Sequence, residues 1–256
     1  MRIARFSFGE AASANFAFGA IEGGEIAVMD GHPFGEVSLT GQRLPLAGVR
    51  LLPPILPSKI VAIGKNYADH AREMGGEPPA EPVIFLKPST SVIGPGAPIV
   101  YPALSQQVDY EGELAVVIGR LCRDVPVDRA KDVVLGYTCA NDVTARDLQR
   151  SDGQWSRAKG FDTFCPLGPW IDTEVDPSDL AISTAVNGET KQSARTSLLL
   201  HDVDELIAYV SAVMTLLPGD VILTGTPAGV GPVVAGDEIS VAIDGIGTLT
   251  NAVVAR

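Results

Sequence analysis

The segment Asp109-Tyr-Glu-Gly-Glu113 runs directly into the apolar stretch Leu114-Ala-Val-Val-Ile118. An apolar run of this length is typical of a buried strand. Residues two apart on a strand project from the same face, so Glu111 and Glu113 are expected side by side. Two carboxylates next to a buried strand are costly unless a cation or a proton compensates them. The alternative, which the spacing leaves open, is a solvated pair on an exposed strand edge.

A third carboxylate, Asp142, follows the apolar run 133–139, where a second strand should end and Thr144 begins a turn of helix. Carboxylates at strand ends converge on clefts, and three of them without histidine or cysteine suit a hard cation such as Mg²⁺ or Mn²⁺. Asp142 could instead only cap the following helix. The pattern therefore predicts a metal site formed by Glu111, Glu113 and Asp142. It does not exclude the alternative of a solvated glutamate pair with Asp142 as a helix cap.

Acid–base chemistry has one histidine candidate. His70 and Glu73 are three residues apart on a helix predicted over 67–74, so they share one face. This arrangement is typical of a general base oriented by a carboxylate. A surface ion pair between the two side chains is the alternative.

Basic residues are sparse, which draws attention to Lys87, Arg146 and Lys159 in apolar surroundings. Beside a metal site such residues would hold an anionic substrate, although each could be an ordinary solvated side chain. Together with three carboxylates and a divalent cation, these three basic residues give the site a formal charge of +2. The local charge therefore favours an anionic ligand only when the metal is bound.

Composition narrows the class of protein. The 256 residues are 46% hydrophobic and carry a net charge of −12, which fits a continuous core and excludes a nucleic-acid or anionic-membrane partner. No stretch approaches the roughly 18 apolar residues of a membrane span, and the N-terminus lacks the apolar region of a secretory signal. Three cysteines without a C-x-x-C motif indicate reduced thiols. We therefore expect a cytoplasmic protein.

The chain divides at a proline-rich segment, 52–57. Residues before it alternate in short apolar patches separated by glycine turns, which predicts a small β-unit with its linker over 1–57. The remainder, 58–256, is the expected catalytic domain. Its predicted elements are strands at 59–64, 83–87, 114–118 and 133–139, a hairpin at Asn187-Gly188, a helix at 202–217 and short strands over 221–254. Mixed sheets with few helices predict an α+β class that is mostly β, a mixed β-sandwich roll and not a doubly wound fold.

In order along the chain, seven blocks resemble the fumarylacetoacetate hydrolase family. The blocks are Ile63-Gly-Lys-Asn-Tyr-Ala-Asp-His-Ala-Arg-Glu-Met74, Phe85-Leu-Lys-Pro-Ser89, Asp109-Tyr-Glu-Gly-Glu-Leu114, Asn141-Asp-Val-Thr-Ala-Arg-Asp147, Lys159-Gly-Phe-Asp162, Val186-Asn-Gly188 and Thr224-Gly-Thr-Pro-Ala-Gly-Val-Gly231. The resemblance covers residues 58–256 and is strongest to the short members with a reduced N-terminal domain. It implies the C-terminal fold of that family, a β-sandwich roll, and a homodimer.

The resemblance also implies roles for individual residues. Glu111, Glu113 and Asp142 match the family's ligands for one divalent cation, Mg²⁺ or Mn²⁺, in each subunit. His70 and Glu73 match a dyad that activates water, and Lys159 matches a lysine that stabilises a developing oxyanion. The substrate-binding positions it implies are Lys87, Arg146, Gln149 and Thr226.

The expected activity follows from this resemblance. A small 2-oxo or 2,4-dioxo acid would react through a metal-bound enolate, most simply by C–C hydrolysis of an acylpyruvate or decarboxylation of oxaloacetate. The alternative is isomerisation of 2-hydroxyhepta-2,4-diene-1,7-dioate, or a 5-carboxymethyl-2-hydroxymuconate-type isomerase–decarboxylase of aromatic catabolism. A non-catalytic ligand-binding protein with a dead site is a remote alternative, since no metal ligand is missing and Lys159 is present.

Overall fold

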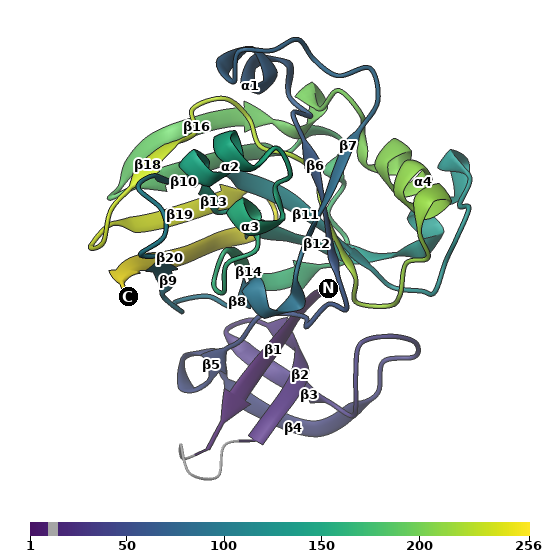
Figure 1. The fold of residues 1–256 in the computed structure, drawn as a ribbon. Helices are drawn as coiled ribbons and strands as arrows, with labels where there is room; N and C mark the ends of the chain where they lie inside the picture. The colour runs from purple at the N-terminus through teal and green to yellow at the C-terminus, as the bar shows by residue number, and fades with distance from the viewer. Residues whose placement is uncertain (10–14) are drawn as a thin grey trace.

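The computed structural model describes residues 1–9 and 15–256, which form mostly β structure in three sheets (Figure 1). The largest sheet has 12 strands. Its hydrogen-bonded order is β4 (Leu39–Pro45), β3 (Glu25–Met29), β2 (Asn15–Glu22), β1 (Arg2–Phe8), β14 (Cys165–Asp172), β12 (Val134–Asn141), β11 (Gly112–Ile118), β17 (Val221–Leu223), β6 (Ile60–Gly64) and β7 (Val83–Lys87), with β5 (Arg50–Leu51) on β1 and β8 (Val92–Ile93) on β14.

Two smaller sheets and short helices complete the described chain. The five-stranded sheet runs β16 (Glu189–Arg195), β15 (Ala181–Val186), β19 (Glu238–Ile243), β20 (Gly247–Ala255) and β9 (Ile99–Tyr101), and the three-stranded sheet runs β13 (Thr144–Ala145), β10 (Val108–Tyr110) and β18 (Gly231–Val233). The α-helices are α1 (Ala68–Glu73), α2 (Arg146–Asp152), α3 (Ser156–Lys159) and α4 (Val203–Val213). The 3₁₀ segments are η2 (Leu46–Gly48), η3 (Ser89–Ser91), η4 (Val127–Val133), η5 (Pro177–Asp179) and η6 (Thr196–Leu198).

Strand β11 is buried on both faces, as its continuous apolar sequence predicts. Leu114, Val116 and Ile118 pack into a core shared with α4 and with the inner face of the five-stranded sheet. The alternate residues, Ala115 and Val117, pack into a second core on the other side of the large sheet. These strands and helices therefore form a layered, mostly β structure, which confirms the predicted fold class.

The N-terminal strands lie at one end of the molecule, at the bottom of Figure 1. β1 pairs with β2 and β5, and its first residues also pair with β14, so Arg2 lies opposite Asp172. Through this register the N-terminal strands extend the large sheet. The division at residue 57 into a small unit and a catalytic domain remains our proposal.

The local predictions for the hairpin and the long helix have different outcomes. Asn187 and Gly188 both have positive φ, 52° and 80°, and connect β15 to β16 as a tight hairpin. Asp202 caps α4 by accepting a hydrogen bond from the Glu205 N–H at 2.9 Å, as expected. The helix ends at Val213, four residues before the predicted end, because Leu216 forms an antiparallel β-bridge with Cys122.

Among the described residues, no helix is long and apolar enough to cross a membrane.

Candidate active site

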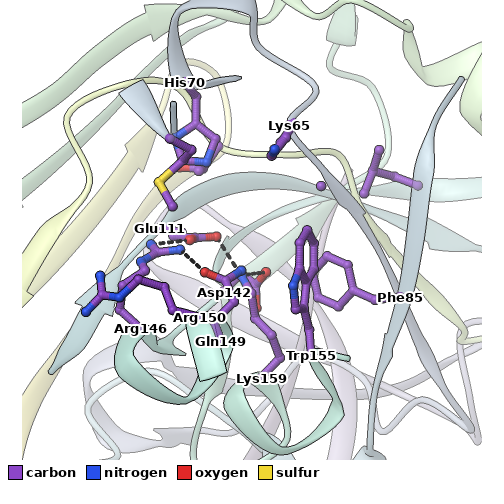
Figure 2. Close-up of a pocket in the computed structure, with 14 residues that line it drawn as sticks. Lys65, His70, Phe85, Glu111, Asp142, Arg146, Gln149, Arg150, Trp155 and Lys159 are labelled. Carbon is purple, nitrogen blue, oxygen red and sulfur yellow. Dashed lines mark hydrogen bonds and ion pairs between the residues drawn. The ribbon is translucent and has the colours of Figure 1, made fainter. Parts of the chain in front are cut away.

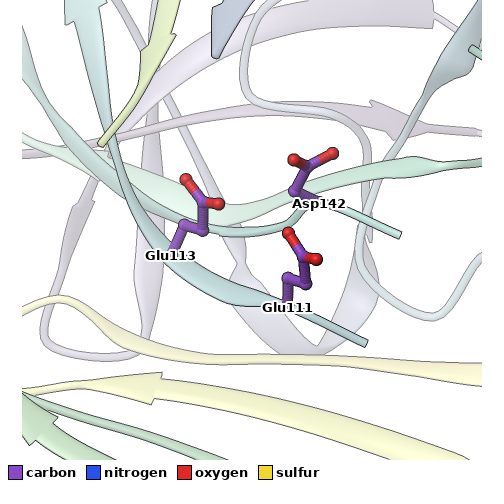
Figure 3. A group of neighbouring side chains, drawn as sticks. All are labelled: Glu111, Glu113 and Asp142. Atoms are coloured by element: carbon purple, nitrogen blue, oxygen red, sulfur yellow. The ribbon is translucent and has the colours of Figure 1, made fainter. Parts of the chain in front are cut away.

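The three predicted metal ligands meet in the interior, on β11 and at the junctions beside it (Figure 3). Carboxylate oxygens of Glu111, Glu113 and Asp142 lie within 4.8 Å of one another, and each residue is at most 4% exposed. The β11–β12 register explains the meeting. Gly112 pairs with Asn141, and the Asp142 N–H donates to the Glu111 carbonyl at 2.8 Å. The carboxylates therefore do not lie on a solvated edge, and the residue at the N-cap of α2 is Ala145, not Asp142.

Gly112 separates the two glutamates for a steric reason. A Cβ atom at this position would lie 2.0 Å from the Thr184 hydroxyl oxygen, closer than any real contact. Glycine lets β11 approach β15 closely at this point. Glu111 and Glu113 project from the other face of the strand, away from this close approach.

Lys159 and Lys87 neutralise part of the cluster. The Lys159 ammonium donates to Glu111 Oε2 at 2.7 Å and to Asp142 Oδ2 at 2.6 Å, and the Lys87 ammonium donates to Asp142 Oδ1 at 2.5 Å. Burial by itself lowers the pKa of Lys159, but the charges of Asp142 and Glu111 outweigh burial and hold the pKa above that of a free lysine. Lys159 therefore carries its positive charge beside the carboxylates.

Arg146 forms a second connection, which includes a carboxylate that the sequence analysis did not assign. Its Nη2 donates to Glu111 Oε1 at 2.6 Å and its Nε donates to Asp109 Oδ2 at 2.8 Å. Asp109 is two residues before Glu111, so the same alternation that selected Glu111 and Glu113 could have identified it. With Asp109 the buried group has four carboxylates against three cations. With all four carboxylates ionised, a divalent cation would change the net charge from −1 to +1, one unit below the expected +2.

Glu113 is the carboxylate of this group for which no cationic partner lies within ion-pair distance among the described residues. It is 1% exposed and accepts one hydrogen bond, from the Gly225 N–H at 2.6 Å. Burial first, and then the charges of Asp142 and Glu111, raise the pKa of Glu113 well above its usual value. An uncompensated buried carboxylate beside two others fits the site of a divalent cation with oxygen ligands.

A cavity of about 170 Å³ opens beside the cluster (Figure 2). Seven of the predicted site residues line it: His70, Glu111, Asp142, Arg146, Gln149, Lys159 and Thr226. Lys87 was expected at the substrate, but it does not line the cavity, and its ammonium, fully buried, lies behind Asp142. The lining also includes Lys65, Phe85, Arg150 and Trp155, which the sequence analysis did not select. The volume suits a small organic acid, being below the roughly 300–1,000 Å³ of sites for larger ligands.

The predicted dyad is formed on α1. His70 Nδ1 lies 3.2 Å from Glu73 Oε2, and His70 is 5% exposed. The Gly229 N–H donates to the other carboxylate oxygen of Glu73 at 3.0 Å, which ties α1 to the loop that follows β17. A carboxylate at Nδ1 favours the tautomer with a proton there, which leaves Nε2 free to accept a proton.

Two aromatic rings form the wall next to Lys159. Phe85 and Trp155 pack edge to face with ring centroids 5.1 Å apart, and the Lys159 ammonium lies 5.0 Å from the Phe85 centroid. The ring face attracts the cation and keeps it from solvent. The sequence analysis gave these aromatic residues no role in the site, because they come from separate segments, β7 and the α2–α3 connection, and meet only in the folded chain.

Comparisons with known proteins assign two family domains along the chain. Residues 59–254 match the family domain described as Fumarylacetoacetate (FAA) hydrolase C-terminal, and residues 1–54 match the Rv2993c-like N-terminal domain. Protein Rv2993c of Mycobacterium tuberculosis is 59% identical over 100% of this chain and 99% of its own length. The mitochondrial oxaloacetate tautomerase FAHD2A of Bos taurus is 46% identical over 82% of this chain and 71% of its own.

Solved structures extend the comparison. A 5-carboxymethyl-2-hydroxymuconate delta-isomerase from Mycobacterium smegmatis superposes with a TM-score of 0.92 at 56% identity and covers 100% of both chains. Maleylpyruvate hydrolase from Sphingobium sp. SYK-6, in complex with manganese(II) and pyruvate, superposes with a TM-score of 0.81 at 37% identity, covering 100% of this chain and 99% of the other.

Proposed function

This chain belongs to the fumarylacetoacetate hydrolase family, and from that premise we propose that it is a divalent-metal-dependent enzyme that enolises a small 2-oxo acid. The observation that carries the proposal is the buried group of Glu111, Glu113 and Asp142, of which Glu111 and Asp142 line a small cavity together with His70. The leading reaction is proton transfer at the carbon next to the keto group, which is tautomerisation or isomerisation. Two named relatives, a tautomerase and an isomerase, support this choice.

The proposed metal site uses the three carboxylates as ligands. A bound Mg²⁺ or Mn²⁺ would act as a Lewis acid toward the keto and carboxylate oxygens of the substrate. The related hydrolase bound to manganese and pyruvate supports a divalent metal with a 2-oxo acid beside it.

The chain's own residues perform the proton transfer. The C3–H proton of the substrate passes to Nε2 of His70, and the bonding electrons form a C2–C3 double bond while negative charge moves to the keto oxygen. Glu73 stabilises the imidazolium that results, because it lies 3.2 Å from Nδ1. Lys159 lines the cavity with its charge in place and stabilises the negative oxygen. Return of the proton to a different atom completes a tautomerisation or an isomerisation.

Hydrolysis of a C–C bond is the second candidate. The same dyad could take a proton from water instead of from carbon, and the resulting hydroxide would attack the C4 carbonyl of an acylpyruvate. The C3–C4 bond then breaks and its electron pair stays on C3, which releases a carboxylic acid and leaves the enolate of pyruvate to take the proton back from His70. The likeness to a maleylpyruvate hydrolase favours this candidate.

A substrate panel tests the proposed function. We expect wild-type protein with Mn²⁺ or Mg²⁺ to tautomerise oxaloacetate, and to lose at least about 10²-fold in kcat/KM when a chelator removes the metal. The panel contains oxaloacetate, acetylpyruvate, fumarylpyruvate and a hydroxymuconate-type diacid, with tautomer exchange, C–C cleavage and CO₂ release followed separately. Turnover that is unaffected by the chelator, or no turnover of any 2-oxo acid, would contradict the proposal.

Substitution of the dyad tests its role. We expect His70→Gln to lower kcat by roughly 10²- to 10⁴-fold, because it removes the proton acceptor. Glu73→Gln should cause a smaller loss of roughly 10-fold, because the base remains but its orientation and charge partner weaken. Steady-state tautomerisation, together with Mn²⁺ binding, distinguishes this result from loss of the metal. Equal, small effects of both substitutions would mean that the dyad only shapes the cavity.

A further inference from the structure

Lys65 is a cavity residue with an unusual backbone. It follows β6 directly and has φ of +58°, in the left-handed region that residues other than glycine seldom adopt. Its half-buried side chain lines the cavity on the wall of His70, across from Asp142 and Lys159 (Figure 2). A strained conformation in a cavity wall suggests that the direction of this side chain matters.

The neighbouring residue, Asn66, fixes the turn that carries Lys65. Asn66 is 1% exposed, and its amide donates to the Thr224 carbonyl at 2.8 Å and to the His201 carbonyl at 2.9 Å. The His201 N–H donates back to the Asn66 side-chain oxygen at 2.9 Å. These three hydrogen bonds hold the turn against two other segments, so the position of Lys65 is set before a ligand binds.

Lys65 differs from the other cavity cations in its charge partners. Lys159 and Arg146 are already bound to carboxylates of the cluster. Within residues 1–9 and 15–256, no carboxylate lies within ion-pair distance of Lys65. Arg150 also lines the cavity, but it is exposed and donates to the Gln107 side chain at 2.9 Å. Lys65 is therefore the half-buried cavity cation available to an anionic group of the ligand.

We propose that Lys65 binds the second carboxylate of a dicarboxylic 2-oxo acid and thereby makes the enzyme selective for diacids. The inference rests on the proposed function, in which the first carboxylate and the keto group lie at the three-carboxylate cluster. A second carboxylate on C3 or beyond would then extend across the cavity toward the wall of Lys65. A charge-assisted hydrogen bond there gives both affinity and orientation.

The same contact has a consequence for the reaction. Loss of CO₂ from a 3-carboxylate breaks the C3–C4 bond, leaves its electron pair on C3, and turns a charged carboxylate into a neutral molecule. A cation bound to that carboxylate stabilises the reactant more than the transition state, so it slows this step. Proton transfer at C3 keeps the carboxylate charged and retains the contact. Lys65 therefore favours tautomerisation or isomerisation of a diacid over its decarboxylation.

Two nearly isosteric substrates test the proposal, oxaloacetate with a charged carboxylate at C4 and acetylpyruvate with a neutral acetyl group there. We compare wild type with Lys65→Met, which keeps the length of the stem, and Lys65→Gly, which accepts the positive φ and so removes the side chain without backbone strain. The ratio of kcat/KM for oxaloacetate to that for acetylpyruvate should fall about 10- to 100-fold in both variants. The fraction of oxaloacetate that loses CO₂ should rise. Lys65→Arg should restore most of the ratio, and Lys131→Met, at an exposed lysine of η4, is the matched control.

The outcomes separate the two proposals. Wild-type turnover with an unchanged ratio in Lys65→Met and Lys65→Gly would overturn the role of Lys65 and leave the proposed function intact. The same holds if Arg150→Met, and not Lys65→Met, removes the preference for the diacid. If wild type turns over no 2-oxo acid of the panel, the proposed function fails, and calorimetric binding of oxaloacetate and acetylpyruvate to the Mn²⁺-loaded protein decides the inference. Equal affinity of wild type for both would then overturn it.

Discussion

Glu113→Gln is expected to abolish metal-dependent turnover, by at least about 10³-fold, while raising the melting temperature of the metal-free protein. The two effects have one cause. Glu113 is a buried carboxylate without a cationic partner among the described residues, next to Glu111 and Asp142. Because burial and the neighbouring carboxylates raise the pKa of Glu113, keeping it ionised or protonating it at neutral pH destabilises the metal-free fold. Its negative charge is needed when a cation occupies the site. The isosteric amide removes that charge and can still accept the hydrogen bond from Gly225.

The expected size follows from the cost of an unpaired buried charge. If the substitution raises the free energy of unfolding of the metal-free protein by roughly 1–3 kcal/mol, the melting temperature should rise by about 2–10 °C for a chain of this length. Adding Mn²⁺ should stabilise wild type further, and once the Mn²⁺ concentration exceeds Kd the free energy of unfolding should rise with the logarithm of that concentration. The variant should show no such rise. Thermal melts and Mn²⁺ titrations measure both effects. Glu238→Gln neutralises an exposed glutamate at the start of β19 and serves as the matched control. Wild-type Mn²⁺ affinity in Glu113→Gln would rule out the proposed ligand set.

Lys159→Met and Lys87→Met form the second experiment, and we expect them to differ in turnover more than in stability. Each substitution removes an ammonium that is bound to Asp142, and each lysine is at most 2% exposed. Breaking a buried ion pair from one side should cost roughly 3–5 kcal/mol in the metal-free protein for either variant. Only Lys159 lines the cavity, so at saturating metal its loss should lower kcat by about 10²- to 10³-fold.

Lys87→Met should lower kcat by less than about 10-fold once metal is saturating, because Lys87 acts through Asp142 and does not face the ligand. Urea denaturation without metal gives the stability change, and tautomerisation at saturating metal gives kcat. Equal losses of kcat in the two variants would mean that Lys159 only positions carboxylates. A large stability loss confined to one variant would contradict the shared role at Asp142.

Local patterns predicted most of the fold. The predicted strand at 83–87 matches β7, and β11 contains all of the apolar run 114–118. Strand β12 begins within one residue of its predicted start but extends two residues further, to Asn141. The predicted end of the long helix was wrong. Its apolar periodicity continues past Val213, and only the distant bridge between Leu216 and Cys122 ends the helix there.

In the candidate site, too, local patterns predicted some residues and only the structure placed the others. The spacing in Asp109-Tyr-Glu-Gly-Glu113 and the position of Asp142 after a strand placed the carboxylates, because strand alternation and strand ends are local properties. The sequence put Lys87 at the ligand and did not select Lys65. The structure places Lys87 behind Asp142 and Lys65 in the cavity wall. Lys87 is the last residue of β7 and Lys65 is the first residue after β6, and their side chains have the same chemistry, so no local pattern separates them.

The sequence by itself thus determined the strand pattern, the mostly β class and the kind of chemistry, a carboxylate cluster with a histidine and few cations. Only the tertiary structure decided which cations neutralise the carboxylates and which remain available to a ligand. The reason is physical. Side-chain identity sets what a residue can bind, but the direction of a side chain depends on backbone torsions and on partners distant in sequence. The positive φ of Lys65, held by Asn66 against Thr224 and His201, is set by those distant contacts.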